Sequence, residues 1–247
     1  MKLGKDIDIL EGLPILYIKS LNALVCSDLH LGFEGVMASK GIFIPKANLK
    51  KIKSEIVKAR KMRMPDTIII DGDIKNEFSN VHVEEFNEFD EFVKFLKSIG
   101  FKRIVLIKGN HDNFIDRYRS STGIEIAKQE MKIGKYLFFH GEKMPEENLK
   151  EVKTWIMGHV HPAIAVYNKV GVKEKLFCFL VGKLGKGREL IILPAMNFFA
   201  GGVEVNMNRV RDISPIFKLA DVNDMRALCI GEGETLDFGK VGKLRYK

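Results

Sequence analysis

Five of the six histidines share one setting, because each lies close to the end of a short apolar stretch of the chain. Four of these stretches read LVCSDLHLG, IVLIKGNHDN, YLFFHGE and WIMGHVHP, and a fifth, IIIDGD, ends in aspartate. Imidazole and carboxylate groups together suit divalent metals such as Mn, Fe, Zn or Co. The pattern predicts a metal site, with candidate residues Asp28, His30, Asp73, Asn110, His111, His140, His159 and His161.

The spacing of these residues favours a catalytic centre over a structural zinc module. Asp28 and His30 are two residues apart, as are His159 and His161, so each pair would point the same way from an extended segment. The pairs are distant in the chain and no cysteine joins them, whereas structural zinc sites use compact, thiolate-rich spacing. A lone histidine is more often exposed or hydrogen-bonded than a ligand, and His82, near the start of a predicted helix, is interpreted that way.

These side chains meet only if the apolar stretches are strands that end at one edge of a sheet. The first half of the chain predicts strands at 14–20, 23–28, 66–73 and 103–110, and helices at 45–63 and 81–99. Pro45 suits the first position of the earlier helix. Strands that alternate with helices imply parallel pairing, and ligand sites in such folds lie beyond the carboxyl ends of the strands.

The second half of the chain predicts more strands and little helix. The expected strands are 135–142, 154–162, 163–168, 175–181 and 189–194, and the expected helix is 145–152. We therefore predict an α/β fold in which two stacked sheets are flanked by helices. The 247 residues fit a single domain, with the motifs in a core of about 14–168 and further strands over about 169–247.

Five motifs occur in a fixed order along the chain: SDLHLG, DGDI, KGNHD, HGE and GHVH. Together they resemble the calcineurin-like metallophosphoesterase superfamily, and they span residues 28 to 161. The resemblance implies a two-sheet β-sandwich flanked by helices, as the pattern of strands and helices also predicts. Within the superfamily, the small archaeal and bacterial phosphoesterases related to DNA-repair-associated phosphodiesterases are the most similar subgroup.

The resemblance also implies a role for each motif residue. Asp73 would bridge two metals, while His111 would bind neither metal and would stabilise the transition state or protonate the leaving oxygen. The other reading of His111 is a residue that orients Asn110. The first metal would be held by Asp28, His30, Asp73 and His161, and the second by Asp73, Asn110, His140 and His159.

Two departures from the family pattern bear on the substrate. Glu142 follows His140-Gly141 at a position where relatives often carry a second histidine. After Gly-Asp the chain reads Ile-Lys-Asn, whereas related proteins often carry Lys-His there. Lys75 is retained, so we expect it to face a phosphate group. Asn197, in PAMNFFAGG (194–202), is a candidate contact to a base or leaving group, although the segment also suits a turn with core phenylalanines.

The chemistry predicted from these residues is metal-dependent hydrolysis of phosphate esters. A phosphodiesterase or nuclease that uses a binuclear metal-activated hydroxide is favoured, and a phosphomonoesterase or nucleotidase is the alternative. A non-catalytic scaffold is disfavoured because all seven ligand positions are occupied by ligating residue types. Nucleic acid and cyclic nucleotides are candidate substrates. We expect two divalent ions, with Mn the first choice and Ni, Co, Fe or Zn as alternatives.

Charge and cysteine content bear on the partners of the protein and on its cellular location. The helix at 45–63 carries eight Lys or Arg against one Glu, much of the net charge of +8, and this predicts either a nucleic-acid surface or a solvated face. The nucleic-acid candidates are Lys50, Lys51, Lys53 and Lys58. No apolar stretch is long enough to span a membrane. Three widely spaced cysteines in apolar stretches predict buried free thiols and a cytoplasmic location.

Overall fold

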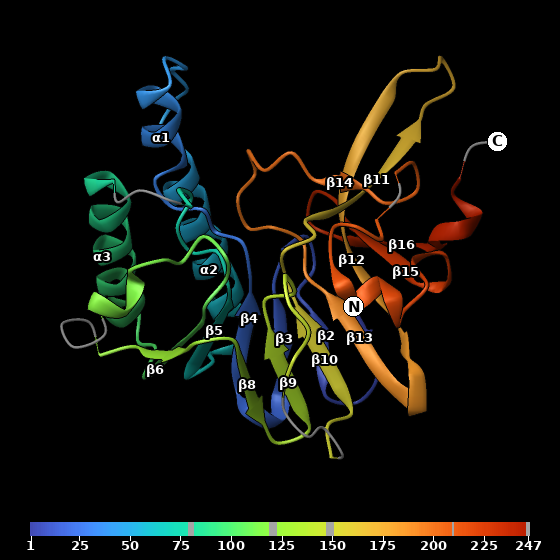
Figure 1. Ribbon diagram of the computed structural model, residues 1–247, viewed down its shortest axis with the longest axis horizontal. Helices are drawn as coiled ribbons and strands as arrows, with labels where there is room; N and C mark the ends of the chain where they lie inside the picture. The colour runs from blue at the N-terminus through green and yellow to red at the C-terminus, as the bar shows by residue number, and fades with distance from the viewer. Residues whose placement is uncertain (79–81, 119–122, 147–150, 209, 246–247) are drawn as a thin grey trace.

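The protein is described by a computed structural model that covers residues 1–78, 82–118, 123–146, 151–208 and 210–245. Two β-sheets pack face to face, and α2 (Asn48–Arg63) and α3 (Val83–Ser98) lie against the outer face of the first sheet (Figure 1). The predicted fold class, two stacked sheets flanked by helices, is confirmed.

The first sheet contains the first seven strands in chain order. They are β1 (Lys2–Leu3), β2 (Ile7–Ile9), β3 (Leu16–Ile18), β4 (Ala23–Cys26), β5 (Thr67–Asp71), β6 (Arg103–Ile107) and β7 (Glu125–Ala127). The strands from β1 to β4 pair antiparallel, and those from β4 to β7 pair parallel. Since α2 and α3 form the crossovers of the parallel part, the carboxyl ends of β4, β5 and β6 meet at one edge.

The second sheet has its own parallel centre. Its strands are β8 (Glu130–Ile133), β9 (Tyr136–Phe139), β10 (Thr154–Met157), β11 (Pro162–Tyr167), β12 (Lys173–Leu184), β13 (Arg188–Ile192), β14 (Val203–Glu204), β15 (Arg226–Ile230) and β16 (Thr235–Lys240). The order is β14-β11-β12-β13-β10-β9-β8, and β15 and β16 extend from β12. Within it β9, β10 and β13 are parallel, so their carboxyl ends also share an edge.

Alternation along the strands divides the core into three layers. In β5, Ile68 and Ile70 pack under the helices, while Ile69 faces the second sheet. In β9, Phe138 fills the layer between the sheets, and Phe139 faces the C-terminal segments. These segments include the 3-10 turns η4 (Pro215–Lys218), η5 (Val222–Asp224) and η6 (Val241–Lys243). Period-two alternation therefore fixes both sheets in register with their neighbours.

The helices differ in detail from those predicted. The helix expected from Pro45 begins at Asn48, because the buried Glu34 carboxylate accepts the N–H groups of Ala47 and Asn48 at 2.8 and 2.7 Å. A further helix, α1 (Phe33–Ser39), was not predicted. Half of the helix expected at 145–152, residues 147–150, lies outside the described residues, and the four residues at its ends are not helical.

The cysteine prediction is confirmed, since all three thiols are buried and free. Among the residues that the structure describes, no helix is both long and apolar enough to cross a membrane. The helix α1 and the hairpin of β11 and β12 both project beyond the same edge of the sheets (Figure 1).

Candidate metal centre

The predicted ligands lie at the edge where parallel strands of both sheets end. Asp28 and His30 follow β4, and Asp73 follows β5, while the second sheet supplies residues just past β9 and β10. Backbone hydrogen bonds join neighbouring strand ends: the Asp28 N–H donates to the Gly72 carbonyl at 3.1 Å, and the His30 N–H donates to the Asp73 carbonyl at 3.0 Å. The two sheets thus bring residues far apart in the sequence to one place.

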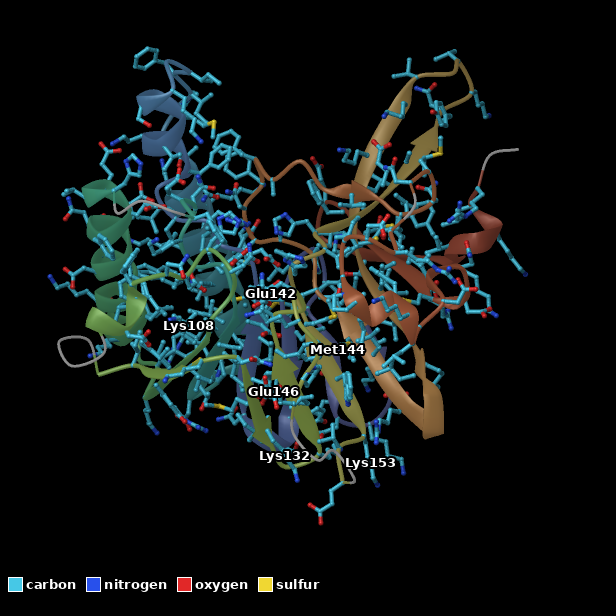
Figure 2. All side chains as sticks on the ribbon, viewed as in Figure 1. Lys108, Lys132, Glu142, Met144, Glu146 and Lys153 are labelled. Atoms are coloured by element: carbon cyan, nitrogen blue, oxygen red, sulfur yellow. The ribbon has the colours of Figure 1, made fainter. Side chains whose placement is uncertain are left out.

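The two ends of the second sheet differ in what they carry. Glu142, just past β9, marks the end of the sheet at which the histidines lie, whereas Lys132 and Lys153 mark the opposite end (Figure 2). The metal candidates are therefore confined to the carboxyl edge of the strands, as expected for parallel sheets.

The first cluster is formed by Asp28, His30 and His161, and one ligand atom from each lies within 4.8 Å of the others. Nε2 of His161 lies 3.0 Å from Oδ1 of Asp28 and 3.3 Å from Nε2 of His30. Two imidazole nitrogens that face each other beside a buried carboxylate suit a shared cation, because both lone pairs can point at it. This cluster contains three of the four ligands expected for the first metal.

The second cluster is formed by Asp73, His140 and His159, again with one ligand atom of each within 4.8 Å of the others. Nε2 of His140 lies 3.1 Å from Oδ2 of Asp73 and 3.9 Å from Oδ1 of Asp28. The second of these distances shows that the two clusters are adjacent. His140 is completely buried, so its imidazole faces other protein groups rather than water.

The ring nitrogens that point away from the clusters are held by backbone carbonyls. Nδ1 of His140 lies 3.1 Å from the Asp71 carbonyl, and Nε2 of His159 lies 3.1 Å from the Ile213 carbonyl. A carbonyl only accepts, so in each ring that nitrogen donates, and when the ring is neutral the other nitrogen carries a lone pair. Metal-binding histidines are commonly oriented in this way.

Asn110 provides a further test of whether the residues fit metal ions. Its Oδ1 is buried and has no hydrogen-bond partner among the described residues, which normally costs about 1–3 kcal/mol. The next residue, His111, donates its backbone N–H to Oδ1 of Asp73 at 2.9 Å, so the Asn110 turn lies against the second cluster. An amide oxygen left without a partner beside carboxylates and imidazoles fits a metal ligand.

The backbone at the ligands is unusual. Eight non-glycine residues in the described part of the chain have positive φ, and five of them are predicted ligands: Asp28, His30, Asp73, His159 and His161, with φ between 45° and 66°. Such residues are uncommon, and they concentrate at functional sites that the surrounding structure holds in place. Both ligands of SDLH and both of GHVH have this conformation, so neither pair lies on the extended backbone that its spacing suggested.

Two motif glycines leave room for carboxylates from other motifs. A Cβ at Gly158 would lie 2.6 Å from Oδ2 of Asp28, and a Cβ at Gly109 would overlap Oδ1 of Asp73. Real Cβ atoms do not approach oxygen so closely. The glycine of GNHD is thus needed for the aspartate of DGDI, and the glycine of GHVH for the aspartate of SDLH.

His111 stands at the clusters without belonging to either. Its Nδ1 lies 2.5 Å from the Asn76 carbonyl, and its Nε2 lies 3.9 Å from Oδ2 of Asp73. Its ring meets that of His30 edge to face, with centroids 5.2 Å apart. The His111 side chain is 29% exposed, more than the 20% of His161 in the first cluster. A polar group with one nitrogen fixed and the other facing both the clusters and solvent is suited to contact a substrate.

The family profile of calcineurin-like phosphoesterases matches residues 21–156, which is more than half of the chain. The chain belongs to the calcineurin-like phosphoesterase family. Among solved structures, nuclease MPE of Pseudomonas putida is 19% identical, with a TM-score of 0.62 over 93% of each chain, a likeness that shows a shared fold. The phosphoesterase YfcE of E. coli is 16% identical over 73% of this chain and 83% of its own, with a TM-score of 0.40. No curated protein matches in sequence.

In this family member, the buried aspartates and histidines shift one another's protonation. Burial alone would lower the pKa of His140 and His161, but the neighbouring carboxylates of Asp73 and Asp28 raise both. Burial and His161 lower the pKa of His30 to about 4. The raised pKa values favour the protonated rings of His140 and His161, and a metal ion must displace those protons, so metal affinity should increase with pH.

Lys75 does not face the clusters as expected. Its side chain is completely buried, and its Nζ lies 3.8 Å from Oε2 of Glu85, an α3 residue that is also fully buried. The same Nζ donates to the carbonyls of His111 and Glu77 at 3.3 and 3.1 Å. Glu85 in turn accepts the Asn76 N–H at 2.9 Å. Lys75 thus supports the turn that holds His111, and it has no surface to offer a phosphate.

The four candidate lysines of α2 have different surroundings. Lys53 forms an ion pair with Glu91 of α3 at 2.5 Å, and Lys50 lines a hollow beside Glu88 and other α3 carboxylates. Lys51 and Lys58 are exposed, and the ammonium of Lys51 lies 4.5 Å above the ring of Phe198. The acidic face of α3 thus neutralises part of the basic helix, while Lys51 adjoins the segment that contains Asn197.

Asn197 is buried beside the first cluster. Its backbone N–H donates to the Asp28 carbonyl at 3.1 Å, its Oδ1 accepts the Phe199 N–H at 2.8 Å, and its buried Nδ2 has no partner among the described residues. The side chain is 1% exposed. The segment is therefore attached to the metal centre, and it presents its phenylalanines rather than Asn197 to solvent.

Two buried acids that support the site were not singled out from the sequence. Asp112 accepts the N–H groups of Gly109, Ile74 and Lys75 at 2.9–3.1 Å, and burial raises its pKa to about 7. Its place after His111 in KGNHD could have identified it. Glu85 gives no such sign, because it lies among several acidic residues at the start of α3.

Proposed function

We propose that the protein is a metal-dependent phosphodiesterase that uses two divalent ions. The observation that carries the proposal is the pair of adjacent carboxylate–histidine clusters, with His111 beside them and free of a ligand's role. Six of the seven expected ligands lie in the two clusters, and this supports the division of ligands that the family resemblance implies. Nucleic acid is the substrate class we place first, which agrees with the nuclease named for the similar structure.

The ligands divide between two ions, with Asp73 shared. One ion would be held by Asp28, His30, Asp73 and His161, and the other by Asp73, Asn110, His140 and His159. When bound, the two ions would neutralise phosphate charge and supply a water of lowered pKa as the nucleophile. The mixture of imidazole, carboxylate and amide oxygen suits Mn as the first choice, with Ni, Co, Fe or Zn as alternatives.

His111 supplies what the ligands cannot, a proton that can move. Its Nδ1–H donates to the Asn76 carbonyl, and this fixes the ring with Nε2 toward the clusters. A proton on Nε2 can then pass to the leaving oxygen as the bond between phosphorus and that oxygen breaks. Lys75 keeps the turn in place through the His111 carbonyl, so its contribution is to position His111.

A diester is favoured over a monoester by the surroundings of Lys75. The terminal phosphate of a monoester carries about one more negative charge than a diester at neutral pH. The lysine expected to meet that charge is instead paired with Glu85 in the interior. A phosphomonoesterase or nucleotidase remains the alternative, and it would have to hold the extra charge with the metal ions alone.

A comparison of two chromogenic substrates tests the proposal. With Mn²⁺ present, kcat/KM for bis(p-nitrophenyl) phosphate should exceed that for p-nitrophenyl phosphate, and EDTA should abolish hydrolysis of both. The Asp73→Asn variant should lose most of its metal, measured by elemental analysis, and nearly all activity. Faster hydrolysis of the monoester would favour the alternative, and hydrolysis that survives EDTA would contradict the metal mechanism.

The buried free thiols are the reason for expecting the protein in a reducing compartment such as the cytoplasm. The location of the native protein in fractionated cells tests this expectation.

A further inference from the structure

Phe78 is an exposed aromatic residue next to His111. Its side chain is 52% exposed, whereas the large apolar side chains of α3 that follow it are mostly buried. Its ring meets the His111 imidazole edge to face, with centroids 5.9 Å apart and planes at 84°. A contact of this geometry covers at most one face of the Phe78 ring. A half-exposed ring beside the residue that contacts the leaving group offers a flat apolar surface to the substrate.

A second aromatic group lies beside the first cluster. The rings of Phe33 and Phe199 are stacked, with centroids 5.5 Å apart, and Phe198 lies 4.0 Å from Phe199. All three side chains are partly exposed. The group is attached to the first cluster at two points, because the Phe33 N–H donates to the His30 carbonyl at 3.3 Å and the Asn197 N–H to the Asp28 carbonyl at 3.1 Å.

A cation completes this second group. Nζ of Lys51 lies 4.5 Å above the Phe198 ring, although Lys51 comes from α2 and Phe198 from the segment before β14. In Figure 1 this segment runs toward the base of α1, which agrees with the stacking of Phe33 on Phe199. No aromatic residue alternates with the lysines within α2 itself; the fold supplies one from another part of the chain.

From this arrangement we infer that the site takes single-stranded nucleic acid, with unpaired bases stacked on Phe78 and on the Phe198–Phe199 pair. This inference rests on the proposed phosphodiesterase function and names its substrate class. Nonspecific single-strand binders combine aromatic stacking surfaces with cations that contact the backbone, and Lys51 supplies such a cation. In a duplex, by contrast, the base faces are already stacked on their neighbours.

The stacking requires bases, so the decisive comparison is between substrates that differ only in them. We would measure kcat/KM with Mn²⁺ for a labelled DNA oligonucleotide, for the same oligonucleotide with abasic residues flanking the scissile phosphate, and for its duplex. The single strand should be preferred over both by about 5- to 100-fold, the range that one stacked base supplies. Equal rates on the abasic strand, or on the duplex, would overturn the inference.

Substitution of Phe78 tests the position of the stacking surface. In Phe78→Leu, and separately in Phe198→Leu, the preference for the base-bearing strand over the abasic strand should fall by at least about fivefold. The matched control is Phe238→Leu, a partly exposed phenylalanine of β16, which should keep the wild-type preference. A preference that persists in both test variants would contradict the inference.

Failure of the inference can be told apart from failure of the proposed function. If the protein hydrolyses bis(p-nitrophenyl) phosphate but does not prefer base-bearing strands, only the inference is overturned. If no phosphodiester is hydrolysed, the proposed function itself is wrong, and the inference is overturned with it.

Discussion

His111 and Asn110 are neighbours in the chain, yet their polar atoms have opposite surroundings. Oδ1 of Asn110 is buried with no partner among the described residues, whereas both ring nitrogens of His111 have a definite neighbour, the Asn76 carbonyl and the Asp73 carboxylate. The first arrangement suits a metal ligand, and the second suits a group that exchanges a proton with the substrate.

We therefore expect His111→Ala to keep both metals and to lower kcat by about 10²- to 10⁴-fold, the usual contribution of general acid–base catalysis. The loss should be smaller for bis(p-nitrophenyl) phosphate than for a dinucleotide, because p-nitrophenolate leaves without a proton. Metal content by elemental analysis and steady-state kinetics on both substrates measure this. His82→Ala, at the start of α3, is the matched control and should match wild type. Loss of one metal ion would identify His111 as a ligand.

At the scale of single residues, the sequence predicts the candidate metal ligands well, but it predicts poorly the buried residues that hold the site in place. Asp28, His30 and Asp73 follow apolar strands, and that setting is visible in the sequence. The partner of Lys75 is Glu85, ten residues on and in another element, and nothing in the local pattern distinguishes it from the acids around it. Ion pairs between elements depend on how the elements pack, which the local sequence does not show. For this reason Lys75 was expected at the substrate, although it lies in the interior.

Among the elements, the turns after the strands depend on close approach between motifs. The turn with Gly109 packs directly on the Asp73 side chain, and the turn with Gly158 packs on Asp28. Each strand end therefore fits only when its neighbours are in place, and the motifs form one unit rather than five separate sites.

A single methyl group should be enough to disturb that unit. In Gly109→Ala the new Cβ would overlap Oδ1 of Asp73 and lie 2.6 Å from the Asp73 backbone nitrogen, so the Asp73 carboxylate must move. We expect metal affinity, measured by calorimetric titration, to fall by about 10- to 100-fold. Gly185→Ala is the control, because its Cβ would meet nothing within 4 Å. Wild-type affinity in Gly109→Ala would show that Asp73 has room to shift.

Nine strands, β3 to β6 and β9 to β13, could be predicted from their apolar runs, and the sheets confirm them. The short strands β1, β2, β7, β8 and β14 and the C-terminal strands β15 and β16 were not predicted as separate strands. The helices were less predictable at their starts. Pro45 suggested the first position of α2, but the helix begins where the Glu34 carboxylate accepts its first N–H groups, and Glu34 lies in α1. The helix α1 itself contains Gly35 and follows Gly32, so its residues offer little indication of a helix.

At the scale of the whole molecule, Asp6 joins the two sheets away from the metal centre. Its carboxylate accepts the Ser20 N–H and hydroxyl at 2.8 and 2.6 Å and the Tyr136 hydroxyl at 2.6 Å, and it lies 2.9 Å from Nζ of Lys135. Ser20 follows β3 of the first sheet, and Tyr136 begins β9 of the second. The stacking of two sheets could be predicted from the sequence pattern. The hydrogen bonds of Asp6 between the sheets could not, because they depend on which strand ends lie together.

Asp6→Ala should lower the free energy of unfolding by about 2 kcal/mol, in the range for hydrogen bonds to a charged group. Although burial opposes it, hydrogen bonding from Ser20, Tyr136 and Lys135 lowers the pKa of Asp6 below its ordinary value of 3.8. The carboxylate's contribution is thus complete above that value and is lost as the pH falls further. Denaturant unfolding at pH 7 and at lower pH should show the difference between wild type and variant shrinking with acid.

Asp90→Ala provides the control for the Asp6 variant. Asp90 forms an exposed ion pair with Lys94 on the same helix at 2.6 Å, a type of pair that contributes about 0.3–0.5 kcal/mol. Equal destabilisation of the two variants at pH 7 would mean that Asp6 contributes no more than a surface charge.

The conformational strain of the left-handed backbone at five residues is imposed when the chain folds, before a metal ion binds. The residues are Asp28, His30, Asp73, His159 and His161. Each such residue costs about 1 kcal/mol or more, so the five together rival the lower end of a whole domain's stability. Backbone hydrogen bonds between strand ends, among them those that the Asp28 and His30 N–H groups donate, hold part of this conformation without a metal ion. We therefore expect the ligand residues to be arranged in the folded protein before a metal ion binds. Loss and rebinding of a metal ion should then not require the chain to refold.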